Sequence, residues 1–160
     1  RRVREELAKL DVKLNEEKTK VVDLRKGEQF GFLGFDFRRK VNSQGKGWPH
    51  YQPKMSSRTK LLRKLKDIFR HHISQPISRV IYLINPILRG WVNYFRVGHS
   101  SKYFGFVKDW VYKKIRRFLM RSRRRQGFGW KRWSRDWIYE KLGVYNDYQV
   151  RRSSKCFSIQ

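Results

Sequence analysis

Residues 85–95, which read NPILRGWVNYF, decide the fold of this chain. The Asn-Pro pair that opens the stretch is typical of a helix start, because Asn suits the N-cap and Pro suits the first helical position. The apolar residues that follow recur at helical spacing, namely Ile87, Leu88, Trp91, Val92 and Phe95. We therefore expect an amphipathic helix that begins at Asn85-Pro86 and ends before Gly98.

Further apolar stripes at helical spacing flank this stretch on both sides. They comprise Leu61, Leu65, Ile68, Phe69 and Ile73, then Ile77, Val80, Ile81 and Ile84, then Phe104, Val107, Trp110, Val111, Ile115, Phe118 and Leu119. Ser56 or Ser57 could cap the first of these helices, and the last runs over residues 101–125. The pattern predicts a mainly α fold, in which Trp91, Phe95, Phe104, Trp110 and Phe118 belong to the core.

The first 41 residues follow a different pattern. Val3, Leu7 and Leu10 indicate the last turns of an amphipathic helix. Residues 21–24 and the apolar run 30–37 read as two strands joined by a turn at Lys26-Gly27. Glycines within the second strand indicate a bulge or a close approach of another backbone. We expect a small α+β unit here, formed by a helix end and a β-hairpin.

Changes of composition divide the chain into four parts. Residues 1–41 carry the α+β unit, and residues 42–56, rich in Gly, Ser, Asn, Gln and Pro, look like a linker. Residues 57–125 carry the helical stripes, and residues 126–160 form a basic, Trp-containing extension. The first residue is not Met and already lies in a helical pattern, so we expect further residues upstream.

Net charge is the strongest functional signal in the composition. Forty Lys and Arg residues oppose thirteen Asp and Glu residues, which leaves a formal charge of +27 on 160 residues. A compact domain tolerates this poorly unless a polyanion neutralises part of it. The aromatic content of 16% argues against a disordered polycation. The composition therefore predicts a folded protein that binds nucleic acid, most simply a structured RNA.

Other function classes find little support in the sequence. The aspartates are scattered through unrelated segments, and the histidines and Cys156 match no zinc-ligand spacing. The chain has no Gly-rich phosphate loop and no apolar run of membrane-spanning length. We expect no catalytic residue, no metal, no cofactor, no membrane partner and no small-molecule substrate for this chain alone. A single cysteine favours a reducing compartment.

Basic residues interleaved with aromatic ones form the pattern that suits phosphates and unstacked bases. The densest cluster, expected on the outer face of the last helix, comprises Arg116, Arg117, Arg121, Arg123, Arg124 and Arg125. Further RNA-binding candidates are Arg58, Arg63, Lys64, Arg70, Arg89, Lys113, Lys131 and Arg132. Candidates for base stacking are Tyr94, Tyr103, Tyr112, Trp130 and Trp133. If two cationic helix faces border one groove, they can hold a duplex backbone without reading its sequence.

Two separate motifs resemble a known protein family. Residues 14–19, LNEEKT, followed by residues 32–35, FLGF, resemble the sixth and seventh conserved blocks of group II intron reverse transcriptases, at the end of the palm. Residues 85–95 resemble the signature of the maturase-specific thumb, or X domain, of the same proteins. The order and spacing of the motifs fit as well, and the motifs together with the segments between them cover most of the chain.

The resemblance implies a helical thumb bundle at residues 57–125, preceded by a remnant of the polymerase palm at residues 1–41. The intact protein would be an RNA-directed DNA polymerase that binds its intron RNA and promotes splicing and retrohoming. Its thumb would clasp the template-primer duplex on one face and intron RNA on another. Phe32, Leu33, Gly34 and Phe35 would form the primer grip, and Lys18 would lie near the incoming nucleotide.

Several alternatives stay open at this point. The family's catalytic aspartates would lie upstream of Arg1, so we expect this chain alone to be inactive, with Mg²⁺ needed only by the intact polymerase. A splicing-only maturase would carry the same motifs, and an unrelated basic structural RNA-binding protein would share the composition. No His-Asn-His endonuclease pattern follows Trp137. The resemblance implies a location in the bacterial cytoplasm or in an organelle.

Overall fold

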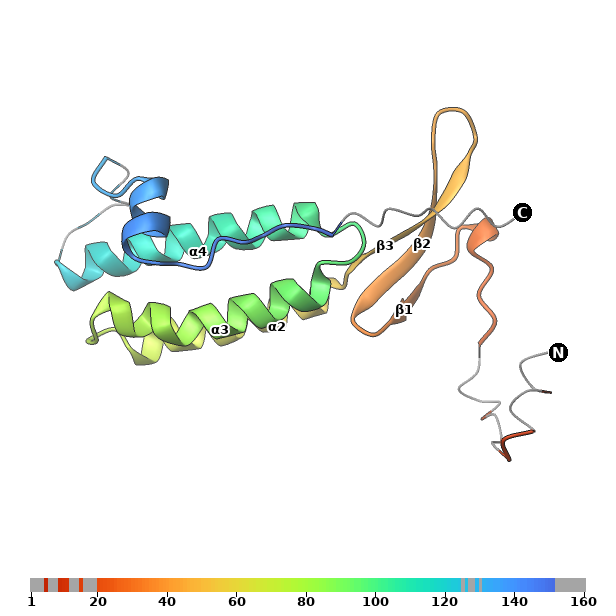
Figure 1. Ribbon diagram of the computed structural model, residues 1–160, viewed down its shortest axis with the longest axis horizontal. Coiled ribbons are helices and arrows are strands. Elements are labelled where there is room, and N and C mark those ends of the chain that lie inside the picture. The colour runs from red at the N-terminus through yellow and green to blue at the C-terminus, as the bar shows by residue number, and fades with distance from the viewer. Residues whose placement is uncertain are drawn as a thin grey trace.

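The computed structural model describes residues 5, 9–11, 15, 20–124, 126, 129 and 131–151. Within them a small antiparallel sheet adjoins a bundle of long helices (Figure 1). The strands are β1 (Phe30–Phe32), β2 (Phe35–Val41) and β3 (Gly47–Pro53), and the long helices are α2 (Met55–His71), α3 (Ile77–Phe95) and α4 (Ser101–Ser122). Two short helices, η1 (Leu24–Lys26) and η2 (Trp137–Lys141), complete the described elements. The expected helical bundle preceded by a small β-containing unit is confirmed.

The apolar run 30–37 folds as a tight hairpin and not as one strand. Phe32 pairs with Phe35, so only Leu33 and Gly34 form the turn between β1 and β2. Both turn residues have positive φ, 45° and 78°, which is the pattern of a type I′ turn and matches the twist of paired strands. The predicted pairing of residues 21–24 with this run is wrong, because residues 24–26 form η1.

Strand β3 occupies most of the segment that we expected to be a linker. It pairs antiparallel with β2, from Phe35 opposite Pro53 to Val41 opposite Gly47. Because β3 is an edge strand, its prolines are tolerated there although they would exclude a central strand. The Asn42 side chain closes the β2–β3 turn by accepting hydrogen bonds from the backbone N–H of Gln44 and Lys46. The linker prediction for residues 42–56 is therefore corrected to a turn, a strand and the start of α2.

Helix α3 runs unbroken through Pro86, so the prediction of two helices that meet at Asn85-Pro86 is wrong. An interior proline costs about 3 kcal/mol because it removes one backbone hydrogen bond and crowds the preceding turn. The fully buried stripe continues across it, with Ile84 before and Leu88 after the proline. Burial of each such side chain contributes about 1.5–3 kcal/mol, which together outweighs the cost.

The other helix ends differ slightly from the prediction. Helix α2 begins at Met55 with Lys54 as its N-cap, so Ser56 and Ser57 lie in its first turn. Helix α4 begins at Ser101 as predicted and ends at Ser122, before the predicted end at residue 125.

The core lies between the three long helices and the segment that follows them. Its centre contains Leu65, Val80, Ile84, Leu88, Val107, Val111, Ile115 and Ile138, all fully buried. A second cluster of Phe35, Val92, Phe95 and Phe104 joins the sheet to the bundle. Burial of Phe95, Phe104 and Phe118 confirms these core assignments, whereas Trp91 and Trp110 are only partly buried.

Residues 142–151, the C-terminal strap, run along the bundle as an extended segment, drawn in dark blue in Figure 1. The Asn85 side chain donates to the Gly143 carbonyl and accepts from the Tyr145 N–H, each over 2.9 Å. The Arg151 N–H donates to the Arg96 carbonyl, and the Arg96 guanidinium pairs with Asp147. Asn85, expected to cap a helix, instead fixes the strap to α3.

Candidate nucleic-acid interface

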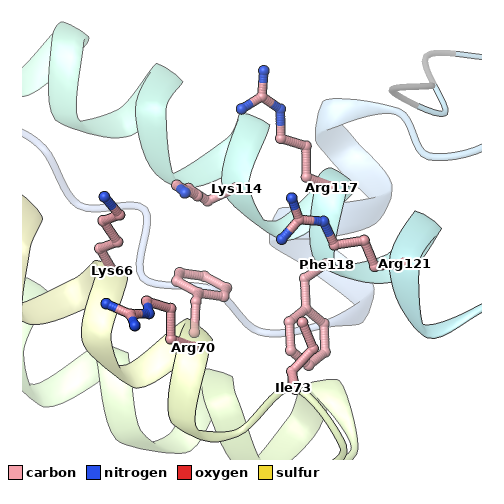
Figure 2. Close-up of a pocket in the computed structure, with 8 residues that line it drawn as sticks. Lys66, Arg70, Ile73, Lys114, Arg117, Phe118 and Arg121 are labelled. Carbon is pink, nitrogen blue, oxygen red and sulfur yellow. The ribbon is translucent and has the colours of Figure 1, made fainter. Parts of the chain in front are cut away.

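A groove between α2 and α4 is lined by Lys and Arg side chains from both helices (Figure 2). Lys66 and Arg70 come from α2, and Lys114, Arg117 and Arg121 come from α4. The groove has a volume of about 300 Å³, and no acidic residue is among the described residues that line it. Two cationic helix faces therefore border one groove, which is the condition under which the sequence allowed a duplex backbone to be held.

Helical spacing explains why these cations gather. Residues 66 and 70 are four apart, and residues 114, 117 and 121 are three and four apart, so each set lies on one side of its helix. Beneath them the rings of Phe69 and Phe118 approach to 6.0 Å between centroids. This apolar contact packs the two helices together and holds the charged heads at the rim.

The cations in the groove raise each other's electrostatic energy. Partial burial lowers the pKa of Lys114, and the positive charges of Arg117, Lys66 and Arg121 lower it further. Like charges this close favour loss of a proton, whereas a bound anion favours the charged amine. A phosphate that enters the groove would therefore relieve a repulsion that the folded protein carries.

Arg116 does not belong to this surface, although the sequence placed it there. Its side chain is only 2% exposed, donates a hydrogen bond to the Trp133 carbonyl, and lies 4.3 Å from the centre of the Tyr112 ring. Burial lowers the pKa of its guanidinium, an effect that Tyr112 partly offsets. Arg116 thus joins α4 to the segment before η2. Its prediction as an outward RNA-binding residue is wrong.

Two of the predicted stacking residues are also part of the interior. Tyr112 and Trp133 are both buried, so neither ring is available to a base in this structure. Both lie around Arg116, where the segment before η2 covers α4. Helix α4 is therefore buried on more than one side, which the single apolar stripe did not reveal.

The remaining predicted cations lie outside the groove. Arg63, Lys64, Arg89, Arg123, Arg124, Lys131 and Arg132 are exposed. Lys113 pairs with Asp109 at 2.8 Å, and the same carboxylate binds Arg135 at 2.7 Å. Arg58 lies at the start of α2, away from Arg70 at its end. Lys18, Arg125 and Trp130 lie outside the described residues.

Lys66 and Lys114 were not among the predicted site residues, yet both line the groove. Their position could have been found from spacing, because each lies four or three residues from a predicted arginine on the same helix side. The segment with the highest local density of arginines, which begins at residue 121, was favoured instead.

The turn of the first hairpin is attached to the helical bundle. The Gly34 carbonyl accepts from the Lys54 N–H at 2.8 Å, and Tyr94 donates its hydroxyl proton to the Leu33 carbonyl. A second cavity of about 440 Å³ lies at this junction. Most of the side chains that line it are apolar, and Lys60 and Lys64 line it as well. The segment 32–35 and the helix α3 motif, far apart in sequence, therefore meet in space.

Two further properties concern only the part of the chain that the structure describes. No group of three or more His, Cys, Asp or Glu side chains in it is placed to hold a metal ion. None of its helices combines the length and the apolar character needed to cross a membrane.

The chain matches the model of a known protein family. The model of the family "Group II intron, maturase-specific domain" matches residues 58–143, more than half of the chain. The matched region extends from the first turns of α2 past the end of η2 and includes the whole α2–α4 groove. No curated protein matches the chain.

Proposed function

Because the chain belongs to the group II intron maturase-specific domain family, we propose that its α2–α4 groove is the surface that holds the backbone of the intron RNA. A maturase domain of this family implies binding of intron RNA and promotion of its splicing. The observation that carries the assignment to the groove is the convergence of cations from two helices on a cleft lined by no described carboxylate.

The groove offers the chemistry that a phosphate backbone requires. Arginine presents a planar fork that matches phosphate oxygens, and lysine adds a compact charge. Residues 114–121 span about 10 Å along α4 at 1.5 Å per residue. At the axial spacing of one strand of duplex DNA, about 3.4 Å, that length corresponds to about three phosphates. Contacts of this kind position an RNA without reading its sequence, and selection of the intron would then depend on its folded shape.

A further part of the proposal concerns the template-primer duplex and retrohoming. Phe32 and Leu33 are exposed at the hairpin turn. The turn is hydrogen-bonded to Lys54, the N-cap residue of α2, and to Tyr94 of α3. Lys60 and Lys64 line the cavity at this junction. This arrangement supports a primer-grip role for residues 32–35 in an intact reverse transcriptase. Mg²⁺ is proposed only for the intact polymerase, and no group of three or more His, Cys, Asp or Glu side chains among the described residues is placed to hold it.

A competition experiment tests the assignment. The purified chain is titrated against a structured domain of a group II intron and against a ribosomal RNA fragment of equal length, at the same salt concentration. We expect tighter binding of the intron domain, and a loss of affinity in the variant Arg117→Gln/Arg121→Gln. Arg79→Gln serves as a matched control, since Arg79 is exposed on α3 and does not line the groove.

Equal affinity for the two RNAs would argue for a general basic RNA-binding protein. Unaltered binding by the double variant would place the interface elsewhere on the molecule.

A further inference from the structure

A second basic pocket lies at the opposite end of the same helix pair. It has a volume of about 380 Å³ and is formed by the sheet and by the first turns of α2 and α4. The side chains that matter are the cations Arg38, Arg58 and Lys102, the amide Gln52, and the rings of Tyr103 and Phe106. Its size falls in the range of small-ligand sites.

Within this pocket the guanidinium group of an arginine lies over two aromatic rings. The Arg58 guanidinium carbon is 4.2 Å from the centre of the Phe106 ring and 5.7 Å from that of Tyr103. Phe106 is nevertheless 44% exposed, so one part of its ring stays open to solvent. Aromatic rings and arginine planes are the surfaces on which proteins stack unpaired bases.

The pocket also contains polar groups that need acceptors. The Nε atoms of Arg38 and Arg58 are buried and have no hydrogen-bond partner among the described residues. A buried donor without a partner destabilises the protein that carries it. Base carbonyl and phosphate oxygens would provide acceptors after a small rotation of these flexible side chains. Gln52 accepts a hydrogen bond from the Arg38 guanidinium through its side-chain oxygen. Its amide group can also form hydrogen bonds with a base edge.

The pocket and the groove belong to one track. Phe106, Trp110 and Lys114 follow at four-residue intervals, so they lie on one side of α4 and lead from the pocket to the groove. Lys114 lies over the Trp110 ring, 5.3 Å from its centre. Arg58 and Arg70, at the two ends, are about 18 Å apart along α2 at 1.5 Å per residue. An RNA strand held in the groove can therefore reach the pocket.

We propose that this pocket receives a single unpaired base of the RNA held in the groove, such as a nucleotide extruded from a bulge. The base stacks on the platform formed by Arg58 and Phe106, and Lys102 and Arg38 bind the adjoining phosphates. This inference rests on the proposed function, because the groove supplies the general affinity. The pocket adds a preference for RNA with an unpaired nucleotide next to a duplex.

The test uses the full chain and three short RNA duplexes. One carries a single-nucleotide bulge, one carries the same bulge with an abasic residue, and one is fully paired. We expect the bulge with a base to bind about tenfold more tightly than the abasic bulge, which keeps the phosphate and removes the stacking surface. Equal affinities for these two RNAs overturn the inference without any substitution in the protein.

Variants then assign the preference to the pocket. Phe106→Ala should bind the base-containing and the abasic bulges alike, and Phe106→Leu, which keeps most of the volume, should do the same if the flat ring is what matters. Tyr82→Ala is the matched control, because Tyr82 is an exposed ring on α3 with Arg79 at 5.6 Å, outside both sites. A preference that survives in both Phe106 variants would place base binding elsewhere.

The two proposals fail in different ways. If Arg117→Gln/Arg121→Gln weakens all three RNAs while the wild type shows no preference, the groove assignment holds and the pocket does not. If the double variant binds all three RNAs as the wild type does, the groove assignment fails, whatever the preference.

Discussion

The hydroxyl group of Tyr94 donates a hydrogen bond to the backbone carbonyl of Leu33 over 2.8 Å. Leu33 lies in the β1–β2 turn and Tyr94 near the end of α3, so this bond joins the two motifs on which the family resemblance rests. The Tyr94 ring also lies near Phe35, with 6.1 Å between centroids. Tyr94 was predicted to bind RNA; its position shows that it holds the hairpin to the bundle.

Replacing Tyr94 by Phe should therefore loosen the hairpin. The substitution removes only the hydroxyl and keeps the ring, and because the bond is exposed we expect a loss of about 0.5–1 kcal/mol in the free energy of unfolding. Hydrogen exchange at the backbone of residues 33–35 should accelerate. Denaturant unfolding with Tyr82→Phe as control checks the value, and an unchanged stability would show that the bond contributes nothing.

Replacing Arg116 by Gln should destabilise the fold more than it affects RNA. The substitution removes the donor to the Trp133 carbonyl from a buried position, which we expect to cost about 1–3 kcal/mol. Arg117→Gln, at the neighbouring exposed position, should change the melting temperature less and weaken RNA binding more than Arg116→Gln does. Thermal melting and RNA titration of both variants separate the two roles. If Arg116→Gln weakened RNA binding and left the melting temperature unchanged, Arg116 would belong to the binding surface.

Replacing Asn85 by Ala should release the C-terminal strap. Two backbone groups, the Gly143 carbonyl and the Tyr145 N–H, lose their partner at once. We expect a loss of about 1–3 kcal/mol and faster proteolysis within residues 142–151. Asn93→Ala is the control, since Asn93 is an exposed asparagine on the same helix. Equal protease resistance of the two variants would contradict the role of Asn85.

Acidification should destabilise the protein through His50. This buried ring lies 4.1 Å from the His99 ring between centroids. Burial lowers the pKa of His50, the hydrogen bond to Gln52 opposes this, and the charges of His99, Lys40 and Arg38 lower it further. Below the ordinary value of 6.5 the unfolded chain then binds more protons than the folded one.

Stability should therefore fall as the pH decreases from 6.5 toward the lowered pKa of His50. Urea unfolding between pH 7.5 and pH 5 measures the effect. His50→Gln should reduce this pH dependence and His71→Gln, at an exposed position, should not. An identical pH profile for His50→Gln and the wild type would exclude His50 as its source.

Sequence periodicity predicted the helical architecture well, because each long helix carries a continuous apolar stripe that is buried in the core. It failed where tertiary contacts override a local signal. Asn85-Pro86 is a good helix start in isolation, yet buried Ile84 and Leu88 keep α3 continuous. Strand β3 was missed because it contains Pro49 and Pro53, and proline is tolerated only in edge strands. A sequence alone does not reveal which strand is an edge.

The candidate site was predicted only in part for a related reason. Arg70, Arg117 and Arg121 were found from charge density and do line the groove. Arg116 was misplaced because the segment before η2 covers a second side of α4, a contact between residues distant in sequence. The pocket around Arg58 and Phe106 was not predicted, because four elements meet to form it.

The salt dependence of RNA binding tests most directly whether the cationic groove holds an RNA backbone. For the wild-type chain we expect the logarithm of the affinity to fall with the logarithm of the salt concentration with a slope of magnitude about 4 or more. In Arg117→Gln/Arg121→Gln the magnitude of the slope should drop by about 1.5–2, since two phosphate contacts are lost. A flat response of the wild type, or the same slope in the double variant, would contradict the assignment.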